Sequence, residues 1–543
     1  MPRFTVLTPV YDTPPDVLEA MLRSVSAQTF DDWEHVLVDD CSPSPQVRER
    51  LERAAAEDPR FRVHFRAENG GIVAASNDAL RLAEGEFVAL LDHDDTLHPD
   101  ALAIVHETLA TTPDCDYLYT DEDKIDEAGH HDAPFFKPDW SPERMRTQMY
   151  TCHLGVLRRS LMEEVGGFDP EYEGSQDWDI VLKVSERARQ VLHVPRVLYH
   201  WRTLATSAAG GGEEAKPWAF EAGTRAVQAH LGRIGFEAEV VRDLETPGVY
   251  HLEPRLTEEP LVSIVIPTAG QRREVRYREV VLVEHCVESI LATSTYANLE
   301  IVVVVDSHLD AATRSRLLEL GGTRVRLVEF EREFNFSAKI NRGVVHSEGE
   351  YLLLLNDDME VVTPNWIERL VMYARRPDIG AVGGRLWWQD GRLQHAGILF
   401  ENGGYPGHVY YGFPGTSGAY SNNILVAQNY LALTGACLMT SRADFEEVGG
   451  LSLDFPMNYN DMDFCLKLDG LGRRNVYDPD TILYHFESSS RDTEVEDWEK
   501  DLLRERWLAR TIVDPSTNPH LRHGMPRLSA PFAWIKRRRL RFP

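Results

Sequence analysis

Short β-branched runs alternate with amphipathic helical patterns over the first hundred residues of the chain. Strands are predicted at 4–8, 35–38, 62–66 and 86–91, and helices at 14–28, 45–57 and 77–83. This alternation is typical of βαβ units with a mostly parallel sheet, so we expect an α/β protein. Ligands bind outside the carboxyl ends of strands in such sheets, and two of these strands end in carboxylates.

The same order of segments returns in the second half of the chain. The matching blocks are SIVIPTAG (263–270) with TVLTPVYD (5–12), IVVVVD (301–306) with HVLVDD (35–40), GEYLLLLNDD (349–358) with GEFVALLDHDD (85–95), NYNDMDFCLKL (458–468) with GSQDWDIVLKV (174–184), and ILYHF (482–486) with VLYHW (197–201). Chance does not produce so many matches in one order, so the sequence predicts a duplicated domain. We expect domains at 1–242 and 261–515, a linker at 243–260 and a basic tail at 516–543.

Composition narrows the function classes. The 543 residues include 87 acidic and 57 basic side chains, a net charge of −30 that disfavours nucleic-acid binding. The six cysteines are scattered without a CxxC pair, which favours a reducing compartment over a disulfide framework or a thiolate zinc site. The N-terminus enters a strand without an apolar signal segment, and no apolar run has the length of a membrane span. We therefore expect a cytoplasmic protein.

The carboxylates at the ends of two matching strands are candidate metal ligands. Asp94 and Asp358 form the aligned pair, with Asp92 and Asp357 beside them. Carboxylate oxygens are hard ligands that suit Mg²⁺ or Mn²⁺ bridging phosphate oxygens. One such cluster alone is more often a solvated acidic turn, but its recurrence after the same apolar strand favours a metal site.

A second pair of carboxylates opens a helical run in each half. Asp177 in QDWD and Asp461 in NDMD are candidate general bases that activate a sugar hydroxyl. Asp179 and Asp463, two positions further on, point to another side and suit capping or anchoring of the helix. The alternative is that both carboxylates of each pair only cap their helices.

His200 and His485 follow strand-like runs near the end of each predicted domain. They can complete a metal shell or contact a diphosphate, with a packed histidine as the alternative. The phosphate loop GxxxxGK[ST], the GxSxG elbow, HExxH and an early GxGxxG are all missing from the sequence. An enzyme without those loops has to hold a diphosphate through a metal, which the strand-end carboxylates allow.

The ordered set of motifs closely resembles glycosyltransferase family 2, the inverting enzymes with the GT-A fold. It consists of TPVYD, VLVDDCS, ENGGIVAASNDAL, GEFVALLDHDD, EVGGFD, SQDWD and LYHWR in the first half, and SIVIPT, IVVVVD, FNFSAKINRG, GEYLLLLNDD, TGACLMTSR, NDMDFCLKL and LYHFESSSR in the second. It is most similar to tandem bacterial enzymes of the O-antigen and rhamnosyltransferase type. The resemblance implies two tandem GT-A domains, each with a Rossmann-like, mostly parallel sheet.

The resemblance also implies a role for each matching residue. The nucleotide-binding positions are Pro9, Tyr11, Asp39, Asp40, Pro267 and Asp306; the metal positions are Asp92, Asp94, Asp357, Asp358, His200 and His485; the catalytic bases are Asp177 and Asp461. Four positions depart from the family pattern: Gln176 and Asn460 stand where Glu usually precedes the base, Ser307 rather than a second Asp follows Asp306, and Asn356 replaces the carboxylate of Asp92.

These roles imply a bifunctional enzyme that moves sugars from UDP-, dTDP- or GDP-sugar donors to a growing surface glycan on a lipid-linked acceptor. One catalytic domain with a degenerate acceptor-binding or structural partner domain is the main alternative, and nucleotidyl transfer is a third. The segment 526–543 carries six basic and several apolar side chains without an acid. Such a segment suits peripheral contact with an anionic membrane, on the inner face of the plasma membrane, or it is a solvated tail.

Overall fold

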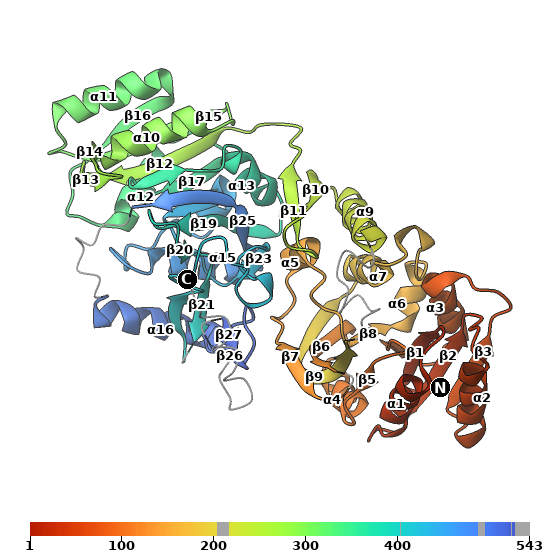
Figure 1. The fold of residues 1–543 in the computed structure, drawn as a ribbon. Coiled ribbons are helices and arrows are strands. Elements are labelled where there is room, and N and C mark those ends of the chain that lie inside the picture. The colour runs from red at the N-terminus through yellow and green to blue at the C-terminus, as the bar shows by residue number, and fades with distance from the viewer. Residues whose placement is uncertain (127, 204–216, 402, 487–494, 523, 527–543) are drawn as a thin grey trace.

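The computed structural model describes residues 1–126, 128–203, 217–401, 403–486, 495–522 and 524–526. Its two halves each contain one large twisted sheet with helices against it (Figure 1). The predicted basic segment 526–543 lies outside the described residues except for its first residue. Among the described helices, none combines the length and apolar character that a membrane crossing needs.

The described residues of the first half form eleven strands and the helices between them. The strands are β1 (Phe4–Val10), β2 (Trp33–Asp39), β3 (Phe61–Phe65), β4 (Phe87–Leu90), β5 (Thr96–Leu97), β6 (Cys115–Ile125), β7 (His131–Phe135), β8 (Gly155–Arg158), β9 (Gln190–Arg202), β10 (Ala238–Arg242) and β11 (Tyr250–Pro254). The helices are α1 (Pro15–Ser26), α2 (Pro45–Glu57), α3 (Gly71–Leu82), α4 (Ala101–Thr111), α5 (Pro142–Thr147), α6 (Arg159–Glu164), α7 (Gln176–Ser185) and α9 (Pro217–Arg233).

The second half repeats this series with additional short strands. The strands are β12 (Val262–Thr268), β13 (Arg272–Val275), β14 (Arg278–Val281), β15 (Leu299–Asp306), β16 (Val325–Phe330), β17 (Tyr351–Leu355), β18 (Met359–Val361), β19 (Ile379–Trp387), β20 (Leu393–His395), β21 (Ile398–Glu401), β22 (Tyr405–His408), β23 (Gln428–Tyr430), β24 (Cys437–Ser441), β25 (Arg474–His485), β26 (Leu521–Arg522) and β27 (Met525–Pro526). The helices are α10 (Leu282–Thr293), α11 (Ala311–Gly321), α12 (Phe336–Val345), α13 (Trp366–Ala374), α14 (Arg442–Glu447), α15 (Asn460–Gly470) and α16 (Asp497–Thr511).

The two large sheets have the same strand order. It is β3-β2-β1-β4-β8-β6-β9-β5 in the first half and β16-β15-β12-β17-β24-β19-β25-β18 in the second. In both, the first four strands are parallel, the next two pairings are antiparallel, the long pair β6–β9 or β19–β25 is parallel again, and the short edge strand β5 or β18 is antiparallel to its neighbour. The α/β prediction with two parallel-rich sheets is confirmed, and the shared order is what a duplication produces.

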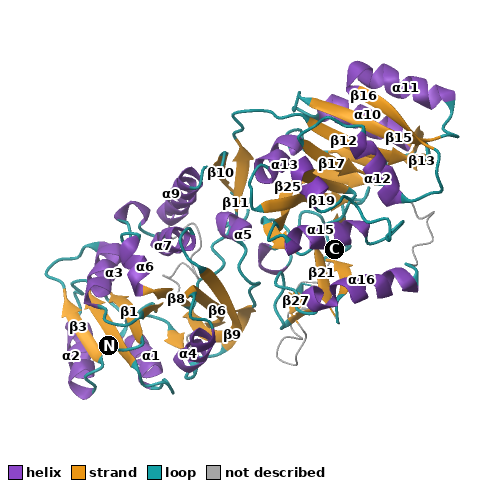
Figure 2. Ribbon diagram, turned by 180° about the vertical axis from the view of Figure 1, so that it is seen from behind, coloured by secondary structure: helices purple, strands orange, loops and turns teal. Residues whose placement is uncertain are grey.

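Burial on both faces explains why the central strands are apolar runs. Every residue of β1 and of β12 is buried, as expected for parallel strands covered by helices on both sides (Figure 2). The helix predicted at 77–83 instead begins at Gly71, because the Asp40 carboxylate at the end of β2 accepts the backbone N–H groups of Gly70 and Gly71. This cap comes from a neighbouring strand and leaves no local signal in the sequence.

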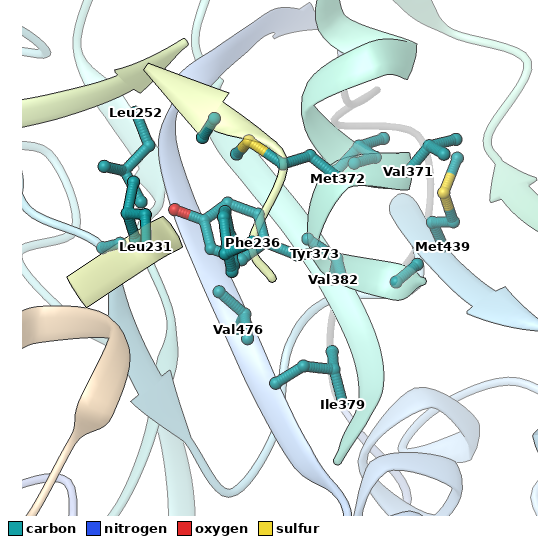
Figure 3. Packing of buried hydrophobic residues seen from close by; sticks show 14 of the residues in the cluster. Leu231, Phe236, Leu252, Val371, Met372, Tyr373, Ile379, Val382, Met439 and Val476 are labelled. Carbon is teal, nitrogen blue, oxygen red and sulfur yellow. The ribbon is translucent and has the colours of Figure 1, made fainter. Parts of the chain in front are cut away.

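The hairpin of β10 and β11 lies between the two halves in both ribbon views, and β11 falls within the predicted linker 243–260 (Figures 1 and 2). Its apolar side chains continue into the second half: Phe236 meets the Tyr373 ring edge-on at 5.6 Å beside Leu252 and Val476 (Figure 3). The two halves therefore share one hydrophobic cluster.

Buried polar contacts join the halves as well. The Arg144 guanidinium is almost fully buried and donates to the Gln428 side chain at 3.1 Å and to the Ser421 carbonyl at 3.1 Å. Near the C-terminus, Asn518 donates to both oxygens of the buried Asp121 carboxylate at 3.1 and 2.9 Å. Because buried polar groups lose stability when left unpaired, these contacts fix how the two halves meet.

Candidate active sites

Three carboxylates converge where β4 ends in the first half. One oxygen from each of Asp92, Asp94 and Asp95 lies within 4.8 Å of the others. Burial, followed by repulsion from neighbouring carboxylates, raises the pKa of Asp95 well above its usual range and also raises that of Asp94. A group of this kind is stabilised by a cation, which offsets the repulsion.

Asp95 is buried and hydrogen-bonded within the fold, whereas Asp92 and Asp94 are partly exposed. The Tyr199 hydroxyl donates to Asp95 at 2.5 Å, and the Arg202 backbone N–H donates to its other oxygen at 2.6 Å. Asp92 remains 43% exposed at its side chain, and a nitrogen of the His153 ring lies 3.8 Å from it. Asp95 is therefore a structural member of the cluster.

His153 is a residue of this site that the sequence motifs did not reveal. Burial opposes its charge, but hydrogen bonding and attraction from Glu122, with help from Asp92, raise the pKa of His153 to about 9. Glu122 itself is paired with the buried Lys137 at 3.0 Å. Glu122 of β6 thus favours the charged form of the His153 imidazole, which lies beside Asp92 just before β8, and no spacing in the sequence indicated it.

Asp177 lies at the start of α7 and faces the same cluster. Burial, with added repulsion from Asp92, raises the pKa of Asp177 to about 6. The Gln176 side-chain amide donates to Asp177 at 3.2 Å while its oxygen accepts the Gly174 N–H at 2.8 Å. An aspartate with this pKa is mostly ionised at neutral pH and is more basic than an ordinary one, as a general base requires.

The predicted nucleotide positions of the first half lie at the ends of β1 and β2. Asp39 is buried and accepts the Ser42 N–H at 3.3 Å. Asp40 forms an ion pair with Arg66 in addition to capping α3, so its carboxylate is occupied by the fold. Pro9 is within β1, and the Tyr11 side chain just beyond it is 48% exposed.

The second half contains a pocket of about 340 Å³ at the matching edge of its sheet. Four residues singled out from the sequence line it: Pro267, Asp357, Asp358 and His485. They come from the carboxyl ends of β12 and β25 and from the turn after β17. The structure thus brings together residues more than two hundred positions apart, as the strand-end argument predicted.

Hydrogen bonds orient the polar groups of this pocket. The Thr268 hydroxyl donates to Asp357 at 2.6 Å, and a ring nitrogen of His485 lies 3.1 Å from Asp358. The Nδ1 atom of His485 lies 2.6 Å from the Gln394 side-chain oxygen. Because that oxygen only accepts, Nδ1 carries a proton and Nε2 is directed toward Asp358.

Lys339 is a second pocket residue that the sequence motifs did not reveal. Its ammonium group is almost fully buried, lies 2.8 Å from Asp306 and donates to the Thr268 carbonyl at 2.9 Å. Asn77 in α3 and Asn341 in α12 make the same pair of hydrogen bonds to the glycine-rich turn of their own half, so these two positions match. The residue two positions before Asn77 is Ala75, which therefore matches Lys339. The buried lysine next to Asp306 therefore has an uncharged match in the first half.

The second candidate base has a different environment from the first. Asp461 accepts backbone N–H groups from Gly435 and Met462, both at 2.8 Å. Burial raises its pKa, and these backbone hydrogen bonds oppose the rise. Asp179 and Asp463 lie against basic side chains, with Lys183 at 2.6 Å and Arg506 at 2.9 Å, which fits the predicted anchoring role.

The structure places His200 away from the strand-end carboxylates. His200 pairs with Thr96 across β5–β9, whereas His485 pairs with Met359 across β18–β25. When β4 is aligned with β17, Met359 matches Asp95 rather than Thr96, so the two histidines differ by one residue in register. A shift of one residue turns a strand side chain to the opposite face. His200 instead contacts Asp123 at 2.6 Å and belongs to a different group of possible ligands from Asp92, Asp94 and Asp95.

Comparison with known proteins finds the same family in both halves of the chain. The model of "Glycosyl transferase family 2" matches residues 5–166 and 263–449. An "Uncharacterized protein y4gI" of Sinorhizobium fredii is 41% identical over 96% of this chain and 58% of its own length. The "O-antigen biosynthesis protein RfbC" of Myxococcus xanthus is 35% identical over 96% of this chain and 40% of its own. The chain thus spans well under two thirds of both relatives.

Among solved structures, S. aureus TarS in complex with UDP-GlcNAc is 22% identical, covers 42% of this chain and 66% of its own, and has a TM-score of 0.36. The family model matches each half separately and together covers most of the chain. The matched segments contain both strand-end carboxylate clusters. The chain belongs to glycosyl transferase family 2.

Proposed function

We propose that the chain is a bifunctional inverting glycosyltransferase, with one active site in each of the domains 1–242 and 261–515. Each site takes a sugar from a nucleotide-sugar donor and transfers it to a growing bacterial surface glycan. The observation that carries the proposal is the placement of Asp177 beside the carboxylates at the end of β4, with a pKa raised to about 6. An acceptor base and a metal-type cluster are then adjacent, as single displacement requires.

The carboxylate clusters suit a divalent cation. Asp92 and Asp94 in the first half, and Asp357 and Asp358 with His485 in the second, would hold Mg²⁺ or Mn²⁺ through oxygen-rich shells. The raised pKa of Asp94 and the packing of three carboxylates indicate a site built for added positive charge. A bound cation there offsets the charge that develops on the leaving diphosphate.

The residues of this chain supply the remaining steps. Asp177, or Asp461 in the second domain, accepts the proton of the acceptor hydroxyl as its oxygen bonds to the anomeric carbon and the bond to the diphosphate breaks. The cationic His153 lies where it can contact the leaving diphosphate in the first domain. In the second domain His485, which comes from β25 and lies beside Asp358, would make this contact instead.

The donor and acceptor classes are part of the proposal. Asp39 and Asp306, with Pro9, Tyr11 and Pro267, bind the nucleotide of a UDP-, dTDP- or GDP-sugar. The printed name of the Myxococcus relative supports a surface polysaccharide as product. A lipid-linked acceptor places the enzyme in the cytoplasm at the inner face of the plasma membrane, with 526–543 as a peripheral foothold.

Differences between the halves support one alternative, in which a single domain is catalytic and the other binds acceptor or is structural. The Asp461 carboxylate accepts two backbone N–H groups, whereas the Asp177 carboxylate accepts the side-chain amide of Gln176. His200 is also turned away from the first cluster, whereas His485 faces the second. Because the two candidate bases have different surroundings, the activity of each half has to be tested separately.

The proposal is tested by screening purified protein for metal-dependent hydrolysis of UDP-, dTDP- and GDP-sugars. Asp94→Ala and Asp358→Ala variants are screened in parallel. We expect release of a nucleoside diphosphate that needs Mg²⁺ or Mn²⁺, with a partial loss in each variant. Release of inorganic pyrophosphate instead would indicate nucleotidyl transfer. Hydrolysis that persists when Asp94→Ala and Asp358→Ala are combined in one protein would refute the metal assignment.

A further inference from the structure

A cluster of two imidazoles and one carboxylate lies on the sheet of the first half, apart from the candidate active site. Asp123 of β6, His131 of β7 and His200 of β9 each bring one ligand atom within 4.8 Å of the other two. The two oxygens of Asp123 are divided between them, one 2.6 Å from His200 and the other 3.0 Å from His131. The rings of the two histidines meet edge-on at 4.4 Å.

Strand register produces this convergence. Asp123 is the direct partner of His200 across the parallel pair β6–β9. On the other side of β6, His131 pairs with Ile125, two positions from Asp123 and therefore on the same face. Three neighbouring strands thus present the three side chains from one surface, and backbone hydrogen bonds fix the spacing.

The sheet separates this cluster from the catalytic carboxylates. Tyr199 and Glu122, the sequence neighbours of His200 and Asp123, point to the opposite face, where Tyr199 contacts Asp95 and Glu122 contacts Lys137. Side chains alternate between faces along a strand, so the two sets cannot share one ion. The cluster therefore needs an explanation of its own.

We propose that Asp123, His131 and His200 bind a divalent transition-metal cation of the Zn²⁺ class. Imidazole nitrogens with one carboxylate oxygen are ligands that Zn²⁺ accepts and that Mg²⁺ does not select. Side-chain exposure is 13% for both Asp123 and His200 but 51% for His131, so the fourth position opens toward solvent. The bound ion ties the β6–β7 hairpin to β9, whose other face holds Asp95.

The test is titration of untagged, metal-stripped protein with Zn²⁺ in excess Mg²⁺, which occupies the carboxylate sites. We expect one equivalent of Zn²⁺ to bind, and His131→Ala to weaken it by at least about 100-fold, since even loss of an outer-shell partner costs about 10–100-fold. The matched control is His130→Ala, because His130 is the adjacent, exposed histidine that pairs with Asp126 instead.

Co²⁺ provides a second readout. Bound at the cluster, it should give visible absorption bands of a low-coordinate nitrogen–oxygen site that persist in His130→Ala and vanish in His131→Ala. His131 is half exposed, so its variant should fold, which circular dichroism verifies. Failure of the wild-type protein to bind Zn²⁺, or equal binding and spectra in His131→Ala, would overturn the proposal and leave a hydrogen-bonded triad.

Discussion

Replacement of Gln176 by glutamate tests the electrostatic account of the active site proposed for the first half. The Gln176 amide nitrogen lies 3.2 Å from Asp177 and stabilises its ionised form by donating a hydrogen bond. Gln176→Glu removes this donor and adds a negative charge in a nearly fully buried position. Both changes favour protonation of Asp177, whose pKa is already raised to about 6.

The size of the effect follows from the geometry. Two like charges about 4 Å apart at an effective dielectric of about 20 repel by about 4 kcal/mol, an upper bound. One pKa unit corresponds to about 1.36 kcal/mol, so the bound is about three units, and relaxation reduces it to one or two. The carboxyl then titrates between about pH 7 and 8, starting from a value of about 6.

The assay is nucleoside diphosphate release as a function of pH in an Asp461→Asn background, where only the first domain turns over. A base is active when ionised, so the rate should rise with pH through the pKa of Asp177, about 6 in the parent. In Gln176→Glu the rise should move to higher pH by at least about one unit.

Asn460→Asp is the matched control, measured in an Asp177→Asn background. The Asn460 amide donates to the Met457 carbonyl rather than to Asp461, so the shift in the second domain should be smaller. A profile of Gln176→Glu that stays in place, or moves to lower pH, would refute the assignment of the rate-controlling ionisation to Asp177.

Three further changes have defined outcomes. Asp177→Asn should raise Tm by a few degrees while abolishing turnover in the first domain only: the folded pKa is above the unfolded one, so ionisation opposes folding increasingly as pH rises from about 4 to 6; no rise at pH 8 would contradict this. Lys339→Met should destabilise the fold by about 3–5 kcal/mol by leaving the Asp306 charge without its partner, measured by urea unfolding, and Lys339→Arg should restore part of it. Arg144→Ala should loosen the contact between the halves, seen as faster proteolysis at 243–260 with both sheets intact; unchanged cleavage would show that the apolar cluster suffices.

The fold was accessible from the sequence because its signals are local. Apolar runs such as IVVVVD are strands whose both faces are covered, and the repeated order of blocks predicted the same strand order twice. The pocket of the second half was also within reach, since Pro267 and His485 lie at the carboxyl ends of strands and Asp358 lies just after one. Once the strands are predicted, the polar residues at their carboxyl ends can be identified as candidate ligand-binding residues.

Features that depend on contacts between distant segments were not accessible. The pairing of Lys339 with Asp306 requires α12 to cross the end of β15, and the raised pKa of His153 requires Glu122 of β6, thirty-one residues earlier in the chain. The same holds for His200, because a one-residue shift between β5 and β9 decides its face and no residue type specifies that shift. Register and long-range charge pairing therefore set the limit of the sequence reasoning.

The central claim is that the chain has two active sites, and product analysis of single-base variants tests it most directly. Purified wild-type, Asp177→Asn and Asp461→Asn proteins are given the active donor sugars and acceptor, and each glycosidic linkage is quantified by mass spectrometry and NMR. The account predicts that each variant loses one linkage or one part of the total rate and keeps the other. If either variant forms every linkage at the wild-type rate, the two-site account is contradicted.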